Sequence, residues 1–117
     1  SDVYFLTSEE SELCTRITRL GYTLNVVSNS LVWHKVSRSM GSDSELSTYF
    51  IYRNKLWFIR RNGSKMRLKD MAELFLYYTV SLASFLIKKR NYGAAKGLVL
   101  GVIDFLRGVS GPGRYGR

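Results

Sequence analysis

Three glutamates near the start of the chain are the side chains best suited to acid–base chemistry. Glu9, Glu10 and Glu12 follow Thr7, and the spacing of Thr7 and Glu10 is that of a capping box, which predicts that a helix begins here. Glu9 and Glu12 would share one face of this helix, while Glu10 would point elsewhere. A carboxylate can act as a general base toward a hydroxyl group. The alternative is structural, because carboxylates at the start of a helix stabilise its dipole.

A second candidate is His34, the only histidine, at the end of an apolar run. A neutral imidazole can ligate a divalent metal, but one histidine does not make a metal site. Lys35, Arg38 and Ser39 follow in a polar loop whose cations and hydroxyls suit a phosphate group. The alternatives are a hydrogen-bonded histidine at a strand end and a solvated surface loop.

A third candidate is an aromatic and basic helix that we expect to begin near Asp43 or Ser44 and to end at Asn62, before Gly63. Arg53 has apolar residues one turn before it and one turn after it, so it is expected to be a partly buried cation that needs a partner. Interleaved cations and aromatic rings could also bind nucleic acid. We favour burial on several sides, because the aromatic residues are too continuous to form an exposed stripe.

These side chains depend on elements that the apolar pattern predicts. Residues 3–6, 22–27 and 31–34 have the short, apolar, β-prone character of strands, and the first helix ends before Gly21. Further helices are expected from Leu68 to about Lys89 and from about Tyr92 to Leu106. The chain would therefore be an α/β fragment with short strands, followed by amphipathic helices.

The last two predicted helices have distinctive faces. Polar residues recur along the first of them from Asp70 to Lys88, and its uncharged run has 14 residues, or roughly 21 Å of helix. Because the hydrocarbon core of a bilayer is about 30 Å thick, a buried or interfacial helix is favoured over a membrane-spanning one. Gly93, Gly97 and Gly101 give the second helix a smooth face that permits close approach of another helix, in protein or in lipid.

Composition limits the classes of protein. The chain has 117 residues, 45% of them apolar, so one small domain or a part of a larger one can be folded. Cys14 is the single cysteine, which excludes an internal disulfide framework and a zinc site of several cysteines. No basic stretch followed by an apolar run opens the sequence, so no signal peptide is expected.

The net charge of +9 is unevenly distributed along the sequence. Residues 1–52 hold four Lys/Arg and six Asp/Glu, whereas residues 53–117 hold fourteen Lys/Arg and three Asp/Glu. This asymmetry indicates a basic half that meets phosphate, either in lipid headgroups or in nucleic acid, unless it is only a solvated surface.

The order of these features resembles the C-terminal part of family 2 glycosyltransferases, in particular the rhamnosyltransferase and galactofuranosyltransferase type. The likeness covers nearly the whole chain. It rests on Glu9-Glu10-Ser11-Glu12-Leu13 with Arg16, then Gly21-Tyr22, Trp33-His34-Lys35, Tyr52-Arg53-Asn54, and Asp104-Phe105-Leu106-Arg107-Gly108.

The resemblance implies a GT-A fold, a nucleotide-sugar donor, a divalent metal (Mg or Mn) and inversion by direct displacement. The residue in the position of the family's general base is Glu10, with Glu9 as the second choice. His34 matches the metal-ligand histidine. Lys35, Arg38 and Ser39 would lie near the donor diphosphate, and Arg53 is assigned to substrate binding with them.

The chain departs from the family in one large respect. No donor-binding Asp-x-Asp motif precedes His34, so residues 1–42 are expected to be the acceptor and metal side of a catalytic domain whose nucleotide-binding half is missing. Residues 43–107 would form a membrane-associating helical region, and residues 108–117, rich in glycine, a flexible tail. The isolated chain is predicted to be inactive.

The expected acceptor is a cell-envelope glycan or a lipid-linked sugar, and the expected location is the cytoplasmic face of the cell membrane, at anionic lipid. Two alternatives without catalysis stay open. One is a basic module that binds nucleic acid or anionic membrane, and the other is an interaction protein that uses the face of Gly93, Gly97 and Gly101.

Overall fold

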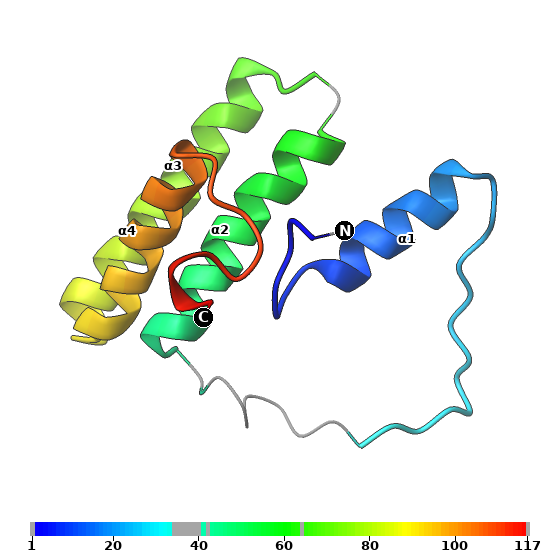
Figure 1. Cartoon of the computed structure of the whole chain (residues 1–117), viewed down its shortest axis with the longest axis horizontal. Helices are drawn as coiled ribbons and strands as arrows, with labels where there is room; N and C mark the ends of the chain where they lie inside the picture. The colour runs from blue at the N-terminus through cyan, green and yellow to red at the C-terminus, as the bar shows by residue number, and fades with distance from the viewer. Residues whose placement is uncertain (1, 34–40, 42, 64, 117) are drawn as a thin grey trace.

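The structure is a computed structural model that describes residues 2–33, 41, 43–63 and 65–116. Its helices are α1 (Glu9–Arg19), α2 (Glu45–Asn62), α3 (Leu68–Ala83) and α4 (Tyr92–Leu106), with a π-helical turn η1 (Ser84–Lys88) and a 3₁₀ turn η2 (Gly113–Tyr115). Helices α2, α3 and α4 lie side by side with α1 beside them, and an extended segment leads away from α1 (Figure 1).

The prediction of an α/β fold is wrong, because the described residues contain helices and no strand. Residues 22–27 and 31–33 are extended and exposed instead, with Val26 97% and Trp33 87% accessible. A β-strand is stabilised by hydrogen bonds to a neighbouring strand, and no described segment lies beside these residues to supply them. Their β-prone composition therefore produces an extended chain and not a sheet.

The predicted helices of residues 43–106 are confirmed nearly to the residue. The Ser44 side chain accepts a hydrogen bond from the Ser47 backbone N–H at 3.1 Å, and Gly63 ends α2. The Asn91 side chain caps α4 in the same way through the Ala94 N–H. These caps satisfy backbone groups that a helix end leaves without partners, which explains why the helices begin and end where the sequence indicated.

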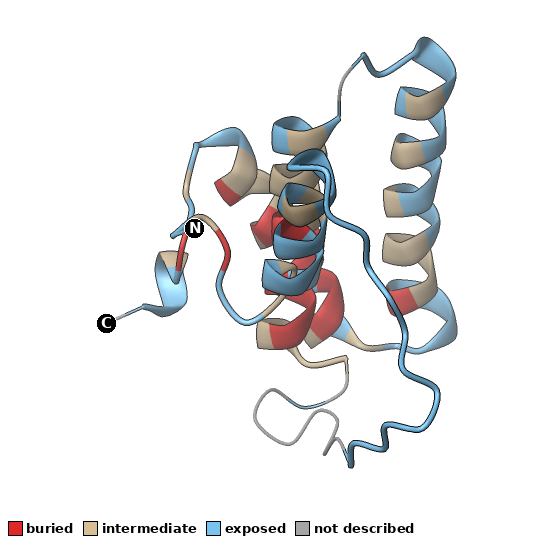
Figure 2. Cartoon of the chain, turned by 90° about the vertical axis from the view of Figure 1, so that its right-hand side faces the viewer, coloured by how far each residue is buried: buried red, intermediate tan, exposed pale blue. Residues whose placement is uncertain are grey.

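The core lies between α2 and α4. Buried residues concentrate in these two helices (Figure 2). Gly97 lies against Glu45, and Gly101 lies against Tyr49 and Arg53, so the two helices run parallel with their backbones close together. A Cβ added at Gly101 would stand 2.8 Å from the Tyr49 carbonyl oxygen. The predicted close approach at the glycine face is confirmed, and the partner is α2 of the same chain.

Helix α3 contacts α2 through tyrosines. The Tyr77 and Tyr52 rings stack with centroids 5.8 Å apart, and the Tyr78 hydroxyl donates to the Tyr52 carbonyl oxygen at 2.7 Å. The Lys55 ammonium lies 3.9 Å from the centroid of the Tyr77 ring. Within Leu68–Ala83 no residue is buried. The apolar side chains of this helix are therefore left largely uncovered by the described part of the chain.

The last residues, for which a flexible tail was expected, fold back over α2 (Figure 1). The Trp57 indole donates to the Val109 carbonyl oxygen at 3.0 Å, and the Gly111 N–H donates to the Val3 carbonyl oxygen at 2.8 Å. The segment thus connects α2 with the beginning of the chain, in contacts that its glycine-rich composition did not indicate.

Candidate functional site

The two candidate bases lie at the start of α1. Helix α1 begins at Glu9 after Ser8, which has a left-handed backbone (φ 72°) and makes no side-chain cap. The predicted capping box of Thr7 and Glu10 is therefore wrong, and the Thr7 hydroxyl instead accepts a hydrogen bond from Asn54 at 3.0 Å. Both Glu9 and Glu10 are exposed, which leaves their carboxylates accessible to a substrate hydroxyl.

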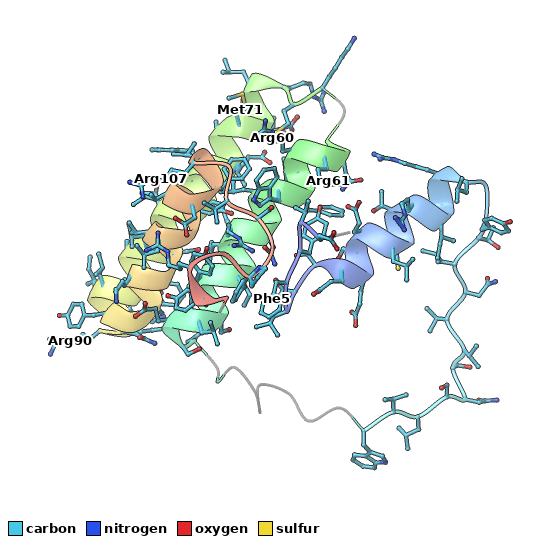
Figure 3. All side chains as sticks on the ribbon, viewed as in Figure 1. Phe5, Arg60, Arg61, Met71, Arg90 and Arg107 are labelled. Atoms are coloured by element: carbon cyan, nitrogen blue, oxygen red, sulfur yellow. The ribbon has the colours of Figure 1, made fainter. Side chains whose placement is uncertain are left out.

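Glu12 has a different environment from its two neighbours. Its carboxylate is buried and accepts hydrogen bonds from the Asn62 side chain at 2.9 Å and from the Tyr4 hydroxyl at 3.0 Å. Arg61, at the end of α2 that faces α1, lies 3.8 Å away (Figure 3). The hydrogen bond from Asn62, with help from Tyr4, lowers the pKa of Glu12, and burial raises the pKa of Tyr4 to about 12. Glu12 therefore joins α1 to α2.

Asn54 fixes the loop that precedes the two candidate bases. Its side-chain amide donates to the carbonyl oxygens of Phe5 and Thr7, both at 3.0 Å, while its own oxygen accepts from Arg53 at 3.1 Å. Because Asn54 is completely buried, these bonds are shielded from water and position the start of α1 on the middle of α2.

Arg53 is fully buried, so the structure satisfies the expectation that this cation needs partners. Its guanidinium donates to the Tyr49 hydroxyl at 3.0 Å, to Asn54 and to the Gly111 carbonyl oxygen. It also lies 5.0 Å from the centroids of the Tyr49 and Phe50 rings. These contacts give Arg53 a structural role in the described residues, and its assignment to substrate binding stays a prediction.

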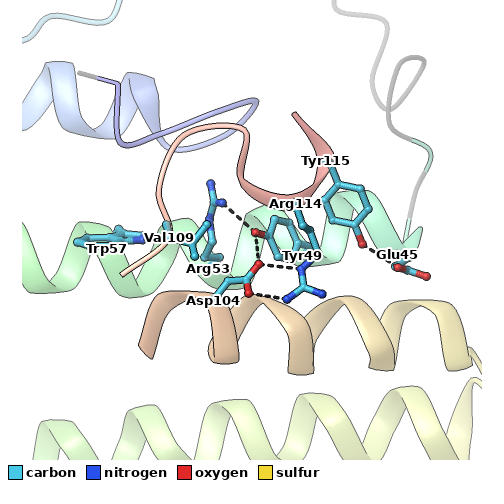
Figure 4. A network of polar contacts seen from close by, with 8 residues as sticks. All are labelled: Glu45, Tyr49, Arg53, Trp57, Asp104, Val109, Arg114 and Tyr115. Carbon is cyan, nitrogen blue, oxygen red and sulfur yellow. Dashed lines mark hydrogen bonds and ion pairs between the residues drawn. The ribbon is translucent and has the colours of Figure 1, made fainter. Parts of the chain in front are cut away.

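A carboxylate on α4 completes this network (Figure 4). Asp104 is buried, accepts a hydrogen bond from the Tyr49 hydroxyl at 2.7 Å, and makes a two-point ion pair with Arg114, with Nε and Oδ2 2.7 Å apart. The hydrogen bond from Arg114 lowers the pKa of Asp104 and raises that of Arg114. The Tyr115 hydroxyl donates to Glu45 at 2.7 Å, which lowers the pKa of Glu45.

Sequence reasoning did not identify Tyr49 and Arg114 as parts of this network. One signal was present, since Asp104 is the single acidic residue in a helix of otherwise apolar and small side chains with one lysine. A buried carboxylate needs a cation or several donors. The glycine-rich composition around Arg114 predicted a flexible tail and therefore gave no sign that Arg114 is the partner of Asp104.

The remaining predicted site residues, His34, Lys35, Arg38 and Ser39, lie outside the described residues. Among the residues that are described, no three His, Cys, Asp or Glu side chains gather into a group that could hold a metal ion. The described side chains therefore do not by themselves fit a divalent metal.

The aromatic residues of α2 are used inside the fold. Tyr49 and Phe50 are fully buried, Tyr52 is 7% exposed, and Trp57 and Phe58 are half-buried, as burial on several sides predicts. An interface for nucleic acid would need such rings to be accessible to bases.

An apolar groove lies between α2, α3 and α4, with a volume of about 540 Å³. Leu56 of α2, Phe75 and Leu82 of α3, and Val99 and Ile103 of α4 are among its lining residues. The groove is well separated along the sequence from Glu9 and Glu10.

Comparisons with known proteins add no relative. No family model, no curated protein and no solved structure matches this chain.

Proposed function

We propose that the chain is the acceptor-side, C-terminal part of an inverting glycosyltransferase that transfers a sugar from a nucleotide-sugar donor to a cell-envelope glycan or lipid-linked acceptor. One observation carries the proposal. Two residues of the Tyr52-Arg53-Asn54 motif contact segments that lie far away in the sequence: Asn54 holds the loop before Glu9 and Glu10, and Arg53 donates to the Gly111 carbonyl oxygen.

The last motif of the resemblance, residues 104–108, is connected to Arg53 as well. Asp104 bonds to the Tyr49 hydroxyl, which in turn accepts a hydrogen bond from Arg53. Hydrogen bonds thus link the motif at residues 52–54 to the loop before Glu9 through Asn54, and to Asp104 through the Tyr49 hydroxyl. We take the function of this hydrogen-bond network to be the positioning of the carboxylates at the start of α1.

The proposed chemistry is a proton transfer coupled to displacement. Glu10 accepts the proton of the acceptor hydroxyl as its oxygen attacks the anomeric carbon of the donor sugar, and the nucleoside diphosphate leaves from the opposite side. Attack from the opposite side inverts the anomeric configuration. Glu9 is the second candidate for the base, because it is the neighbouring exposed carboxylate.

The donor site is assigned to a nucleotide-binding half that the present sequence does not contain. The isolated chain is accordingly proposed to be inactive, and a divalent metal would need ligands beyond the described residues.

The proposed location is the cytoplasmic face of the cell membrane, because residues 53–117 carry fourteen cationic side chains against three carboxylates. Anionic lipid attracts such a surface by about 1 kcal/mol for each cation near it. Sedimentation with anionic and with neutral vesicles tests this part, and equal binding to both would contradict it.

The catalytic part is tested in the longer protein in which a nucleotide-binding half precedes this chain. Its coding sequence is expected to contain a strand-ending Asp-x-Asp motif after βα units. Sugar transfer is then measured for the wild type, Glu10→Gln and Glu9→Gln. We expect loss of transfer in Glu10→Gln, with retained donor binding as the control. A Glu10→Gln enzyme as fast as the wild type would refute the assignment, and loss only in Glu9→Gln would transfer the role to Glu9.

A further inference from the structure

Helix α3 exposes many apolar side chains. Phe75 is 75%, Leu76 62% and Val80 57% exposed. Together with η1 it forms a 21-residue helix, Leu68–Lys88, that is long and apolar enough to cross a membrane, and only 6% of its apolar window is buried. Exposed apolar patches of this kind mark sites of protein or membrane contact.

The groove beside α3 has the chemistry of a hydrocarbon site. Its volume of about 540 Å³ is typical of a pocket for a small organic ligand. Only two of its lining residues carry a hydroxyl, and both are used within the protein: Thr79 donates to the Phe75 carbonyl oxygen at 2.8 Å, and Tyr78 donates to the Tyr52 carbonyl oxygen. The groove therefore offers aliphatic and aromatic surface with no free hydroxyl donor among its lining residues.

Cations stand at one end of this groove. Arg60 follows the groove residue Leu56 by one helical turn, and Arg107 follows the groove residue Ile103 by the same spacing. Because α2 and α4 are parallel, both arginines reach the same end, where Met71 of α3 also lies (Figure 3). Both are exposed, and a guanidinium binds phosphate oxygens through two parallel hydrogen bonds.

We infer that the groove between α2, α3 and α4 accepts the hydrocarbon chain of an anionic membrane lipid, with the lipid phosphate at the Arg60 and Arg107 end. The inference deepens the membrane part of the proposed function and rests on that part alone, since it does not require sugar transfer. In this arrangement α3 lies in the membrane interface with its exposed apolar side toward the hydrocarbon.

Charge favours a lipid over a second copy of this chain. The basic half of a second copy would bring the same excess of cations to the interface, whereas an anionic lipid brings a complementary phosphate. The short uncharged run of α3 also favours the interface over a full crossing, because acidic and basic side chains occupy its first turns.

Lipid entry is tested with the full chain and vesicles of brominated phosphatidylglycerol or brominated phosphatidylcholine. An environment-sensitive fluorophore is placed on Val99→Cys, which lines the groove from α4 and is 39% exposed, in a Cys14→Ser background. A second probe on Val80→Cys reports the outer side of α3. The natural Cys14 on α1, which is exposed and distant in sequence, is the matched control.

Anionic vesicles are expected to quench the Val99 probe and leave the Cys14 probe unchanged. Quenching of the Val80 probe alone would show flat insertion with an empty groove and would overturn the inference while membrane binding stands. Absence of vesicle binding would overturn both. Protection of the Val99 probe in a lipid-free dimer, measured by sedimentation velocity, would assign the groove to a second copy and overturn the inference.

The phosphate position is tested by paired charge reversals. Arg60→Glu with Arg107→Glu is expected to weaken binding to anionic vesicles by at least about tenfold. Lys88→Glu with Arg90→Glu makes the same charge change at the other end of α3 and is expected to have a several-fold smaller effect. Equal losses in the two double variants would contradict the assignment of the phosphate to the Arg60 and Arg107 end. Far-ultraviolet circular dichroism establishes that each variant keeps its helices.

Discussion

Two glycines on the same face of α4 are predicted to respond in opposite ways to the same substitution. At Gly97 an added Cβ would overlap the Glu45 carbonyl oxygen and lie 3.0 Å from the Tyr49 nitrogen. Both are backbone atoms of α2, which cannot rotate away as a side chain can. At Gly93 the nearest atom to an added Cβ is the Asn91 side-chain oxygen at 3.6 Å, an ordinary contact.

The magnitudes follow from these distances. Gly97→Ala must separate α2 from α4, and overpacking of this kind costs about 1–3 kcal/mol, which exceeds the gain of up to about 1 kcal/mol in helix propensity. Gly93→Ala keeps the gain in helix propensity without an overlap with α2, and it is expected to stabilise the protein by up to about 1 kcal/mol.

The assay is urea unfolding followed by circular dichroism at 222 nm, a wavelength that reports helix content. A lower midpoint for Gly97→Ala and an equal or higher midpoint for Gly93→Ala, at unchanged slope, are the expected results. A Gly97→Ala variant as stable as the wild type would refute the close contact of α2 and α4.

Three further predictions concern the buried polar groups. Asp104→Asn removes the charge that faces Arg114 and should cost about 2–4 kcal/mol at pH 7 in urea unfolding. Because the hydrogen bond from Arg114 lowers the pKa of Asp104 in the folded state, this stabilisation is complete above the unfolded pKa and is lost as the pH falls through the folded pKa. The difference in stability between variant and wild type should therefore shrink with decreasing pH. Asn54→Ala should speed amide hydrogen exchange at the start of α1 and cost about 1–3 kcal/mol, and unchanged exchange would contradict its role in holding the loop. Tyr4 should ionise near pH 12 in an ultraviolet titration, because burial raises its pKa. Its contribution to the stability of the fold is therefore complete below about pH 10 and is lost as the pH rises toward 12. A titration midpoint near pH 10 would contradict its burial against Glu12.

Local patterns in the sequence were sufficient for the helices of residues 43–106. Ser44 and Gly63 are capping residues whose effect is confined to neighbouring backbone groups, so the bounds of α2 could be predicted directly from the sequence. Strands are different, because their hydrogen bonds come from another segment. Residues 22–27 have the composition of a strand, but no described segment pairs with them, and the α/β prediction failed for that reason.

In the candidate site too, the local sequence predicted some features, while others depend on contacts between distant segments. The sequence indicated that Arg53 would be partly buried and would need a partner, because that follows from its apolar neighbours on one helix. It could not indicate that the partner is the Gly111 carbonyl oxygen, 58 positions further along, or that Arg114 would pair with Asp104. A glycine-rich composition describes the freedom of an isolated segment and not the contacts available once α2 and α4 have packed.

We propose that Glu10 is the base of a sugar-transfer reaction, and this is tested most directly by kcat for sugar transfer by the longer protein with Glu10 replaced by Gln and by Asp. General-base catalysis contributes about 10²–10⁴-fold, so Glu10→Gln is expected to lose at least a hundredfold in kcat while the KM for the nucleotide-sugar stays within a few-fold. Glu10→Asp, which keeps the carboxylate, is expected to retain measurable transfer. Equal rates for the wild type and Glu10→Gln would contradict the role of Glu10 as the base.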